Sequence, residues 1–197
     1  MSRNPELTRQ LIIDKALPIF NTKGYAAASI SDITAATGIT KGAIYGNFKN
    51  KDEVATAAFE KGVEIVATEI GKRVRKEKTA PDKLKAIVEF YQEYIKEPPI
   101  PGGCPVMNSS IEADDSLPFL RSKVIRSIAL LKDSLIKMVN RGILEGQIKR
   151  DVDAEEFANF FYSVIEGVTS LSRIEGDGRS FAFVKKFVIK QIEEISI

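Results

Sequence analysis

Apolar residues recur at helical spacing along nearly the whole chain, and polar segments with glycine or proline separate the helical stretches. A first helix is predicted after the Asn4-Pro5 pair, which is typical of a helix start, and it should end at Gly24. Further helices are predicted over residues 29–37, 40–48, 50–76, 81–97, 117–141, 153–174 and 180–195, with a shorter one from Asn108. The segment PPIPGGCP, residues 98–105, is predicted to be an irregular loop. Because no segment alternates as a strand would, the pattern predicts an all-α fold of about nine helices.

The segment from Ser29 to Phe48 predicts two short helices joined by a tight turn. Ser29 and Asp32 have the spacing of a capping box, which begins the first of these helices. Gly38 can adopt the left-handed backbone conformation that turns the chain, and Thr40 can cap the second helix. This is the arrangement of a helix-turn-helix, in which the second helix enters the major groove of DNA.

Apolar positions within this segment predict which of its side chains face DNA. Ile39, Ile44 and Phe48 should pack into the small core and leave a polar face outside. Lysine can contact a phosphate or a guanine edge, asparagine can bond an adenine edge, and hydroxyl groups can donate to phosphate. An alanine methyl can touch thymine, and glycine permits close approach of the DNA backbone. The candidate DNA contacts are Ser29, Ser31, Thr40, Lys41, Gly42, Ala43, Tyr45, Asn47 and Lys51.

Charge is distributed unevenly along the chain. Residues 1–51 contain seven Lys or Arg and three acidic residues, a net charge of +4, whereas the whole chain carries +2. The remainder must therefore carry −2. A basic first quarter on a slightly acidic body suits a protein that contacts a polyanion through one end.

Composition narrows the possible chemistry. The chain has no histidine, the commonest acid–base group, and it has no nucleophile elbow, phosphate loop or zinc signature. The sequence therefore predicts no enzyme, no cofactor and no metal site, and catalysis by lysine, tyrosine or carboxylate groups is the remaining alternative.

A single cysteine, Cys104, excludes an intramolecular disulfide and fits a reducing compartment. A polar N-terminus and short apolar runs predict a cytoplasmic protein without a membrane span.

Many spaced positions in the first quarter of the chain agree with one known family. These positions are Ala16, Phe20, Gly24-Tyr25, residues 33–45, Asn47-Phe48 and residues 51–54. On these residues the chain resembles the tetracycline-repressor (TetR) family of bacterial transcriptional regulators. Two positions depart from the family pattern: Asn47 stands where histidine is frequent, and Pro18 is unusual within the first helix.

The resemblance implies a helix-turn-helix domain over residues 1–50 and a ligand-binding and dimerisation domain over residues 51–197. It implies a repressor that binds a palindromic operator as a homodimer and is released by a small, mostly apolar effector. The alternative is a helical protein that binds or sequesters a small molecule, in which the N-terminal motif is only structural.

The last two predicted helices are rich in apolar residues and are candidates for the dimer interface. They can equally form plain core, and the resemblance favours half of an intermolecular four-helix bundle. The candidate interface residues are Phe157, Val164, Gly167, Val168, Phe181, Val184 and Val188.

Aromatic residues gather in the middle of the sequence, where the resemblance implies an effector pocket. Core packing is the alternative for most of them. The candidate pocket residues are Phe90, Tyr94, Cys104, Met107, Asn108, Phe119, Phe161 and Tyr162, with Ser109 and Glu112 as further polar groups. Cys104 is a candidate sensor of electrophiles or oxidants, although a buried cysteine usually behaves as a small inert hydrophobe.

Overall fold

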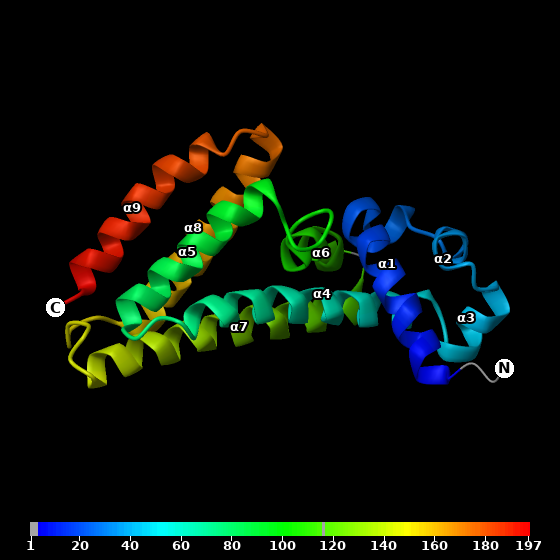
Figure 1. The fold of residues 1–197 in the computed structure, drawn as a ribbon, viewed down its shortest axis with the longest axis horizontal. Coiled ribbons are helices and arrows are strands. Elements are labelled where there is room, and N and C mark those ends of the chain that lie inside the picture. The colour runs from blue at the N-terminus through cyan, green and yellow to red at the C-terminus, as the bar shows by residue number, and fades with distance from the viewer. Residues whose placement is uncertain (1–3, 116) are drawn as a thin grey trace. The chain divides into compact units, whose positions relative to one another are not determined.

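The computed structural model describes residues 4–115 and 117–197, and these residues form nine α-helices (Figure 1). The helices are α1 (Pro5–Ala27), α2 (Ile30–Thr37), α3 (Lys41–Asn47), α4 (Lys51–Val74), α5 (Ala80–Lys96), α6 (Pro105–Asp115), α7 (Pro118–Leu144), α8 (Ala154–Glu175) and α9 (Arg179–Ile195). Within the described residues the only β pairing is one isolated antiparallel bridge between Ile148 and Ser196. The predicted all-α fold is confirmed.

The helices form two compact units. The first contains the chain up to Val66 together with Pro99–Arg126, and the second contains Ala67–Pro98 and Ser127–Ile197. The boundary between them therefore falls within α4 and α7. This division by packing differs from the expected boundary after residue 50, because residues 99–126 pack with the N-terminal helices.

Helix α1 contains a break at Gly24, where φ is +77°. The helix was expected to end there, but helical structure resumes and continues to Ala27. The Glu112 carboxylate of α6 accepts hydrogen bonds from the backbone N–H groups of Tyr25, at 2.6 Å, and Ala26, at 3.1 Å. A Cβ at position 24 would lie 2.9 Å from this carboxylate, so both the backbone angle and the close approach favour glycine.

The loop before α6 is held against α1 by two asparagines. Asn21 donates to the carbonyls of Pro101, at 2.8 Å, and Gly103, at 2.7 Å. Asn108 donates to the carbonyls of Asn21, at 3.0 Å, and Gly102, at 2.9 Å. The segment predicted to be irregular is therefore ordered by side-chain amides, and α6 is part of the unit that contains α1.

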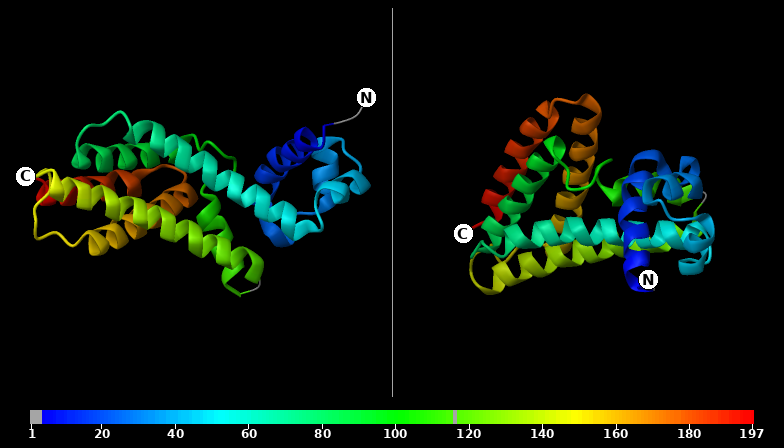
Figure 2. Two further views of the ribbon diagram at one scale, coloured as in Figure 1. Left: turned by 90° about the horizontal axis from the view of Figure 1, so that it is seen from below. Right: turned by 45° about the vertical axis from the view of Figure 1, so that its right-hand side comes forward.

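In the second unit, α5, α8 and α9 pack against one another (Figure 2). The Asp153 side chain caps α8 by accepting from the N–H groups of Glu155 and Glu156, and Gly176 ends the helix with φ of +78°. The shared core is apolar and includes Leu84, Val88, Phe161, Ile165, Phe181, Val188 and Ile192.

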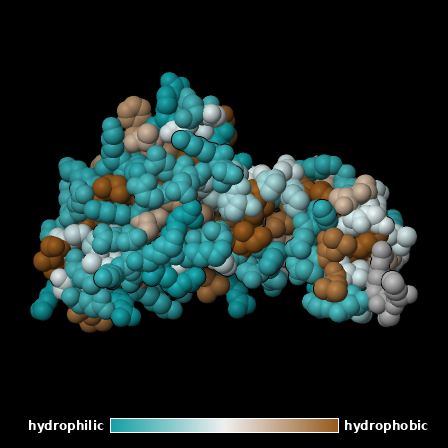
Figure 3. Space-filling model, in the orientation of Figure 1, coloured by the Kyte–Doolittle hydropathy of each residue, from teal (hydrophilic) through white to brown (hydrophobic). Residues whose placement is uncertain are grey.

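The surface seen in Figure 3 is mainly hydrophilic, with separate small apolar patches. Among the described helices, none is both long and apolar enough to cross a membrane.

We expect Glu112→Ala to lower the free energy of unfolding by roughly 1–3 kcal/mol, because two backbone N–H groups at the break in α1 lose their acceptor. Urea titration followed by circular dichroism measures this change. Glu64→Ala is the matched control, because Glu64 is an exposed α4 residue whose ion pair with Lys61 should contribute little. Equal stability of the two variants would contradict the proposed anchoring role of Glu112.

Candidate DNA-binding surface and effector pocket

The start of α2 is fixed by a reciprocal cap. The Ser29 hydroxyl accepts from the N–H of Asp32 at 3.1 Å, and the Asp32 carboxylate accepts from the N–H of Ser29 at 2.8 Å. Lys23 pairs with the same carboxylate at 2.7 Å. Hydrogen bonds from Lys23 and then Ser29 lower the pKa of Asp32 from 3.8 to about 2. Ser29 therefore holds the supporting helix in place, whereas Ser31 is exposed on α2.

A left-handed turn at Gly38, with φ of +68°, leads into α3. The Thr40 hydroxyl caps this helix by accepting from the N–H of Ala43 at 3.3 Å. Ile44 and Phe48 are buried beneath the helix, as the sequence predicts. Burial of these two anchors fixes which face of α3 points outward.

The outer face of α3 presents Lys41, Gly42 and Tyr45, which are all exposed. Tyr45 is 43% exposed, which is unusual for so large a ring, and the Lys41 Nζ lies 5.9 Å from the ring centre. The neighbouring Ala43 is half-buried. These residues form a small basic and aromatic surface. Neither Lys41 nor Tyr45 is buried in the core.

The polar groups of Asn47 bond to other residues of the protein. Its side-chain amide donates to the backbone carbonyl of Ala43 at 2.8 Å, and its backbone carbonyl accepts from the Arg9 guanidinium at 2.9 Å. The same guanidinium lies 4.1 Å from the centre of the Phe48 ring and 3.6 Å from Glu53. Arg9 thus ties α1 to both α3 and α4, a role that the sequence pattern did not reveal.

Lys51 is also engaged with the protein rather than pointing freely outward. Its Nζ donates to the carbonyl of Tyr25 at 2.5 Å and lies 4.0 Å from the Tyr25 ring centre. The Tyr25 hydroxyl donates to Asp52. Burial raises the pKa of Tyr25 to about 12, and the Asp52 carboxylate contributes to the same shift. Lys51 therefore links α1 to α4 within this unit, and its expected phosphate contact stays a prediction.

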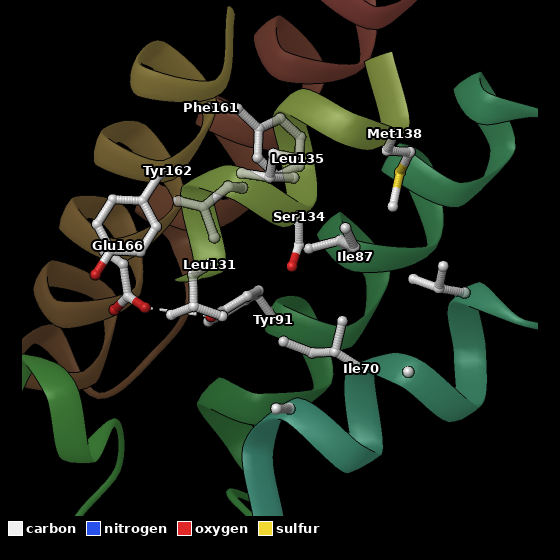
Figure 4. Close-up of a pocket in the computed structure, with 14 residues that line it drawn as sticks. Ile70, Ile87, Tyr91, Leu131, Ser134, Leu135, Met138, Phe161, Tyr162 and Glu166 are labelled. Carbon is white, nitrogen blue, oxygen red and sulfur yellow. Dashed lines mark hydrogen bonds between the residues drawn. The ribbon is translucent and has the colours of Figure 1, made fainter. Parts of the chain in front are cut away.

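A cavity of about 210 Å³ lies in the second unit, among the helices α4, α5, α7 and α8 (Figure 4). Its walls are mostly aliphatic and aromatic. The lining residues are Ala67, Ile70, Gly71, Val74, Ile87, Tyr91, Leu131, Ser134, Leu135, Met138, Phe161, Tyr162, Ile165 and Glu166. A cavity of this kind, apolar with a few polar groups, is typical of small-molecule sites.

Two of the eight predicted pocket residues, Phe161 and Tyr162, line this cavity. Phe90 and Tyr94 are buried beside it, with ring centres 5.2 Å and 5.8 Å from that of Tyr91.

The other predicted pocket residues, Cys104, Met107, Asn108 and Phe119, belong to the first unit. Cys104 is buried, and Phe119 packs edge-on against Tyr25. Asn108, Ser109 and Glu112 border a much smaller cavity there, of about 30 Å³. The expected grouping of all eight residues around one pocket is therefore corrected, because helical periodicity does not say which apolar faces meet.

Among the lining residues that the sequence prediction missed, Glu166 is the one with a formally charged side chain. Its side chain projects from a buried face of α8, and the residue is only 3% exposed. The Tyr91 hydroxyl donates to the Glu166 Oε1 at 3.2 Å. An acidic residue directly after the apolar run Val164-Ile165 was the signal available in the sequence.

The predicted dimer residues divide between core and surface. Those buried within their own chain are Phe157, Val168, Phe181 and Val188, and for them the interface assignment is corrected. Gly167 is exposed, and Val164 and Val184 are half-buried. The large apolar residues that α8 and α9 expose are Leu171, Ile174, Phe183 and Phe187. Both helices are apolar on more than one side, so periodicity alone cannot separate the inner face from the outer one.

Comparison with known families gives matches to both parts of the chain. The family model described as "Bacterial regulatory proteins, tetR family" matches residues 12–58. A second model, "Tetracyclin repressor-like, C-terminal domain", matches residues 80–188.

Individual relatives extend over nearly the full length. A TetR transcriptional regulator from Chloroflexus aurantiacus J-10-FL is 33% identical, with 98% of each chain covered and a TM-score of 0.93. A TetR-family regulator from Cytophaga hutchinsonii is 32% identical, with 98% of this chain and 96% of that chain covered and a TM-score of 0.92. The HTH-type transcriptional repressor DhaR of Mycobacterium sp. (strain GP1) is 25% identical, over 89% of this chain and 86% of the relative.

We expect the stability difference between the wild-type protein and Asp32→Asn to shrink as the pH falls from 5 toward 2. Because the folded-state pKa of Asp32 lies below its usual value, the carboxylate stabilises the fold above about pH 4 and loses this effect on protonation. Urea unfolding at several pH values measures the difference. Ser31→Ala, an exposed change in the same helix that alters no titrating group, should show a constant difference. A constant difference for Asp32→Asn as well would refute the capping role of its charge.

Proposed function

This chain belongs to the tetR family of bacterial regulatory proteins, and we propose that it represses transcription by binding operator DNA as a homodimer. A small molecule in the cavity of the second unit would release it. The observation that carries the proposal is the outer face of α3, where Lys41 and Tyr45 are exposed above the buried anchors Ile44 and Phe48.

We assign direct DNA contacts to the exposed part of the helix-turn-helix. Lys41 supplies a cation for a phosphate or a guanine edge, and the Tyr45 hydroxyl is a donor to phosphate. Gly42 lets the DNA backbone approach, and the Ala43 methyl is placed for contact with thymine. Thr40 and Ser31 are exposed polar residues of the same helix-turn-helix, and we assign them contacts with phosphate.

Ser29, Asn47 and Lys51 are assigned positioning roles instead. Each uses side-chain polar atoms to bond the backbone of its own unit. They fix the angle at which α3 is presented, which matters because a misplaced recognition helix loses several base and phosphate contacts at once.

The homodimer is supported by the apolar residues that α8 and α9 leave exposed. Phe183 is 72% exposed and Phe187 is 55% exposed, and the Phe187 ring lies 6.3 Å from that of Phe160. Two copies related by a two-fold axis would cover these rings and present two recognition helices to a palindromic site, about 34 Å or a multiple of it apart.

Release requires an effector that binds one conformation better than the other. Three residues separate α3 from α4, and four of the later residues of α4 line the cavity: Ala67, Ile70, Gly71 and Val74. A change in the cavity therefore acts on the helix that directly follows the recognition helix in the chain. The proposed role requires no catalysis and no cofactor, and we propose a cytoplasmic location, because that is where a bacterial regulator meets its DNA.

We expect Lys41→Ala combined with Tyr45→Phe to lower operator affinity at least about tenfold and to reduce the slope of log affinity against log salt by about one. A gel-shift titration at several salt concentrations, on a duplex selected from random DNA by the wild-type protein, measures both quantities. Lys137→Ala, which also removes an exposed lysine but on α7, away from the proposed DNA-binding and dimer surfaces, is the control. Unchanged binding by the double variant would reject the assigned contacts. Absence of salt-dependent DNA binding by the wild-type protein would favour the alternative of a small-molecule-binding protein with a purely structural motif.

We expect Phe183→Glu combined with Phe187→Glu to yield a monomer with operator affinity lowered at least about tenfold, because charges would replace the apolar contact between copies. Sedimentation velocity gives the oligomeric state, and the gel shift gives the affinity. Ile111→Glu introduces a charge at a similarly exposed apolar residue of α6 and should leave the dimer intact. A double variant that still sediments as a dimer would place the interface elsewhere.

A further inference from the structure

The cavity of the second unit carries its charge at one place. Among the described residues that line it, Glu166 alone has a formally charged side chain, and aliphatic and aromatic groups form most of the remaining wall. Figure 4 shows Glu166 and Tyr162 toward the left of the close-up and Met138 toward the right, with Tyr91 between them. The one formal charge among the described lining residues therefore lies toward one side of the cavity.

From this arrangement we infer that the effector is an amphiphilic cation. Its protonated amine would bind the Glu166 carboxylate, and an aromatic or alkyl body would fill the space toward Ile87 and Met138. This deepens the proposed function, on which it rests, by naming the chemical class of the effector.

The burial of Glu166 is the first reason. The residue is 3% exposed, and a carboxylate removed from water is costly unless charged or hydrogen-bonding groups compensate it. The Tyr91 hydroxyl provides one hydrogen bond, at 3.2 Å. A ligand ammonium group would add a charge-assisted hydrogen bond, which is roughly twice as strong as a neutral one.

Two basic side chains that lie over aromatic rings of this unit are already engaged outside the cavity lining. Lys132 donates to Asn159 at 2.6 Å while its Nζ lies 5.7 Å from the Tyr162 ring centre. Arg73 pairs with Glu93 at 2.5 Å and stacks on Phe90. Neither residue lines the cavity. Since the described lining residues include a carboxylate and no cation, an anionic ligand would meet a like charge there.

The size and shape of the cavity are the second reason. A volume of about 210 Å³ corresponds to about seven water molecules, yet apolar walls of this kind hold water poorly. A ligand body would restore the dispersion contacts that the cavity walls lack. The Tyr91 and Tyr162 rings beside Glu166 add faces that attract a cation. Tyr162 and Glu166 lie four residues apart on α8, so they share one side of the helix.

Three probes with the same body test the inference: 4-phenylbutylamine, 4-phenylbutan-1-ol and 4-phenylbutanoate. Isothermal titration of the purified full-length protein should give the amine an affinity about tenfold or more above that of the alcohol, with the carboxylate weakest. In Glu166→Gln the amine should lose about tenfold in affinity, and the alcohol should change less than about threefold. Glu156→Gln, an exposed change on the same helix, should preserve the wild-type ranking.

An amine that binds no more tightly than the alcohol, a carboxylate that binds most tightly, or a Glu166→Gln variant that keeps the preference would each overturn the inference. The wild-type ranking needs no variant, so it remains decisive if Glu166→Gln fails to fold. Operator binding is measured separately by gel shift with and without the amine. If the protein binds no DNA with or without the amine, while the ranking of the three probes holds, the proposed function alone is refuted. If a neutral or anionic probe releases the DNA and the amine does not, the cationic effector alone is refuted.

Discussion

The carboxylate of Glu112 holds together the part of the molecule that presents the recognition helix. It accepts two backbone hydrogen bonds directly after the break in α1, where Gly24 has a positive φ. Within the same unit, Arg9 near the other end of α1 bonds the carbonyl of Asn47 at the end of α3. Helix α1 is therefore attached at one end to α6 and at the other to α3. A displacement of α6 would therefore act on α1, which is also bonded to the recognition helix α3. The helices of this unit can then move together.

Features of the recognition segment that depend on neighbouring residues could be predicted from the sequence. The Ser29–Asp32 cap, the left-handed Gly38 and the buried Ile44 all follow from local chemistry within a few residues. The roles of Lys51 and Asn47 could not be predicted in this way. Lys51 bonds Tyr25, 26 positions away, and Asn47 accepts from Arg9, 38 positions away. A polar side chain near a DNA-binding surface can serve the protein or the DNA, and its distant partners decide which.

A similar limit applies to the two C-terminal helices. Phe181 and Phe183 are two residues apart on α9, yet Phe181 is buried and Phe183 is exposed. The apolar residues of α9 predicted that this helix forms an interface. They did not show which residues contact α8 and which remain exposed to solvent. The distinction needs the rotation of each helix about its own axis, which is fixed by packing among α5, α8 and α9. The face left open exposes two phenylalanine rings, Phe183 and Phe187, which the proposed contact with a second copy would cover.

Glu166 departs from the pattern of its own helix, and that departure bears on function. Its neighbours on the buried side of α8, including Phe161 and Ile165, follow the rule that core positions are apolar. An apolar residue of similar volume at position 166 would fill the same space without the cost of removing a charge from water, and such replacements often stabilise proteins. The hydrogen bond from Tyr91 offsets part of that cost. Sites where local rules fail are expected at functional positions, because binding rather than folding then accounts for the residue. A carboxylate beside an apolar cavity gives a ligand both orientation and charge selection, and a purely apolar wall would give neither.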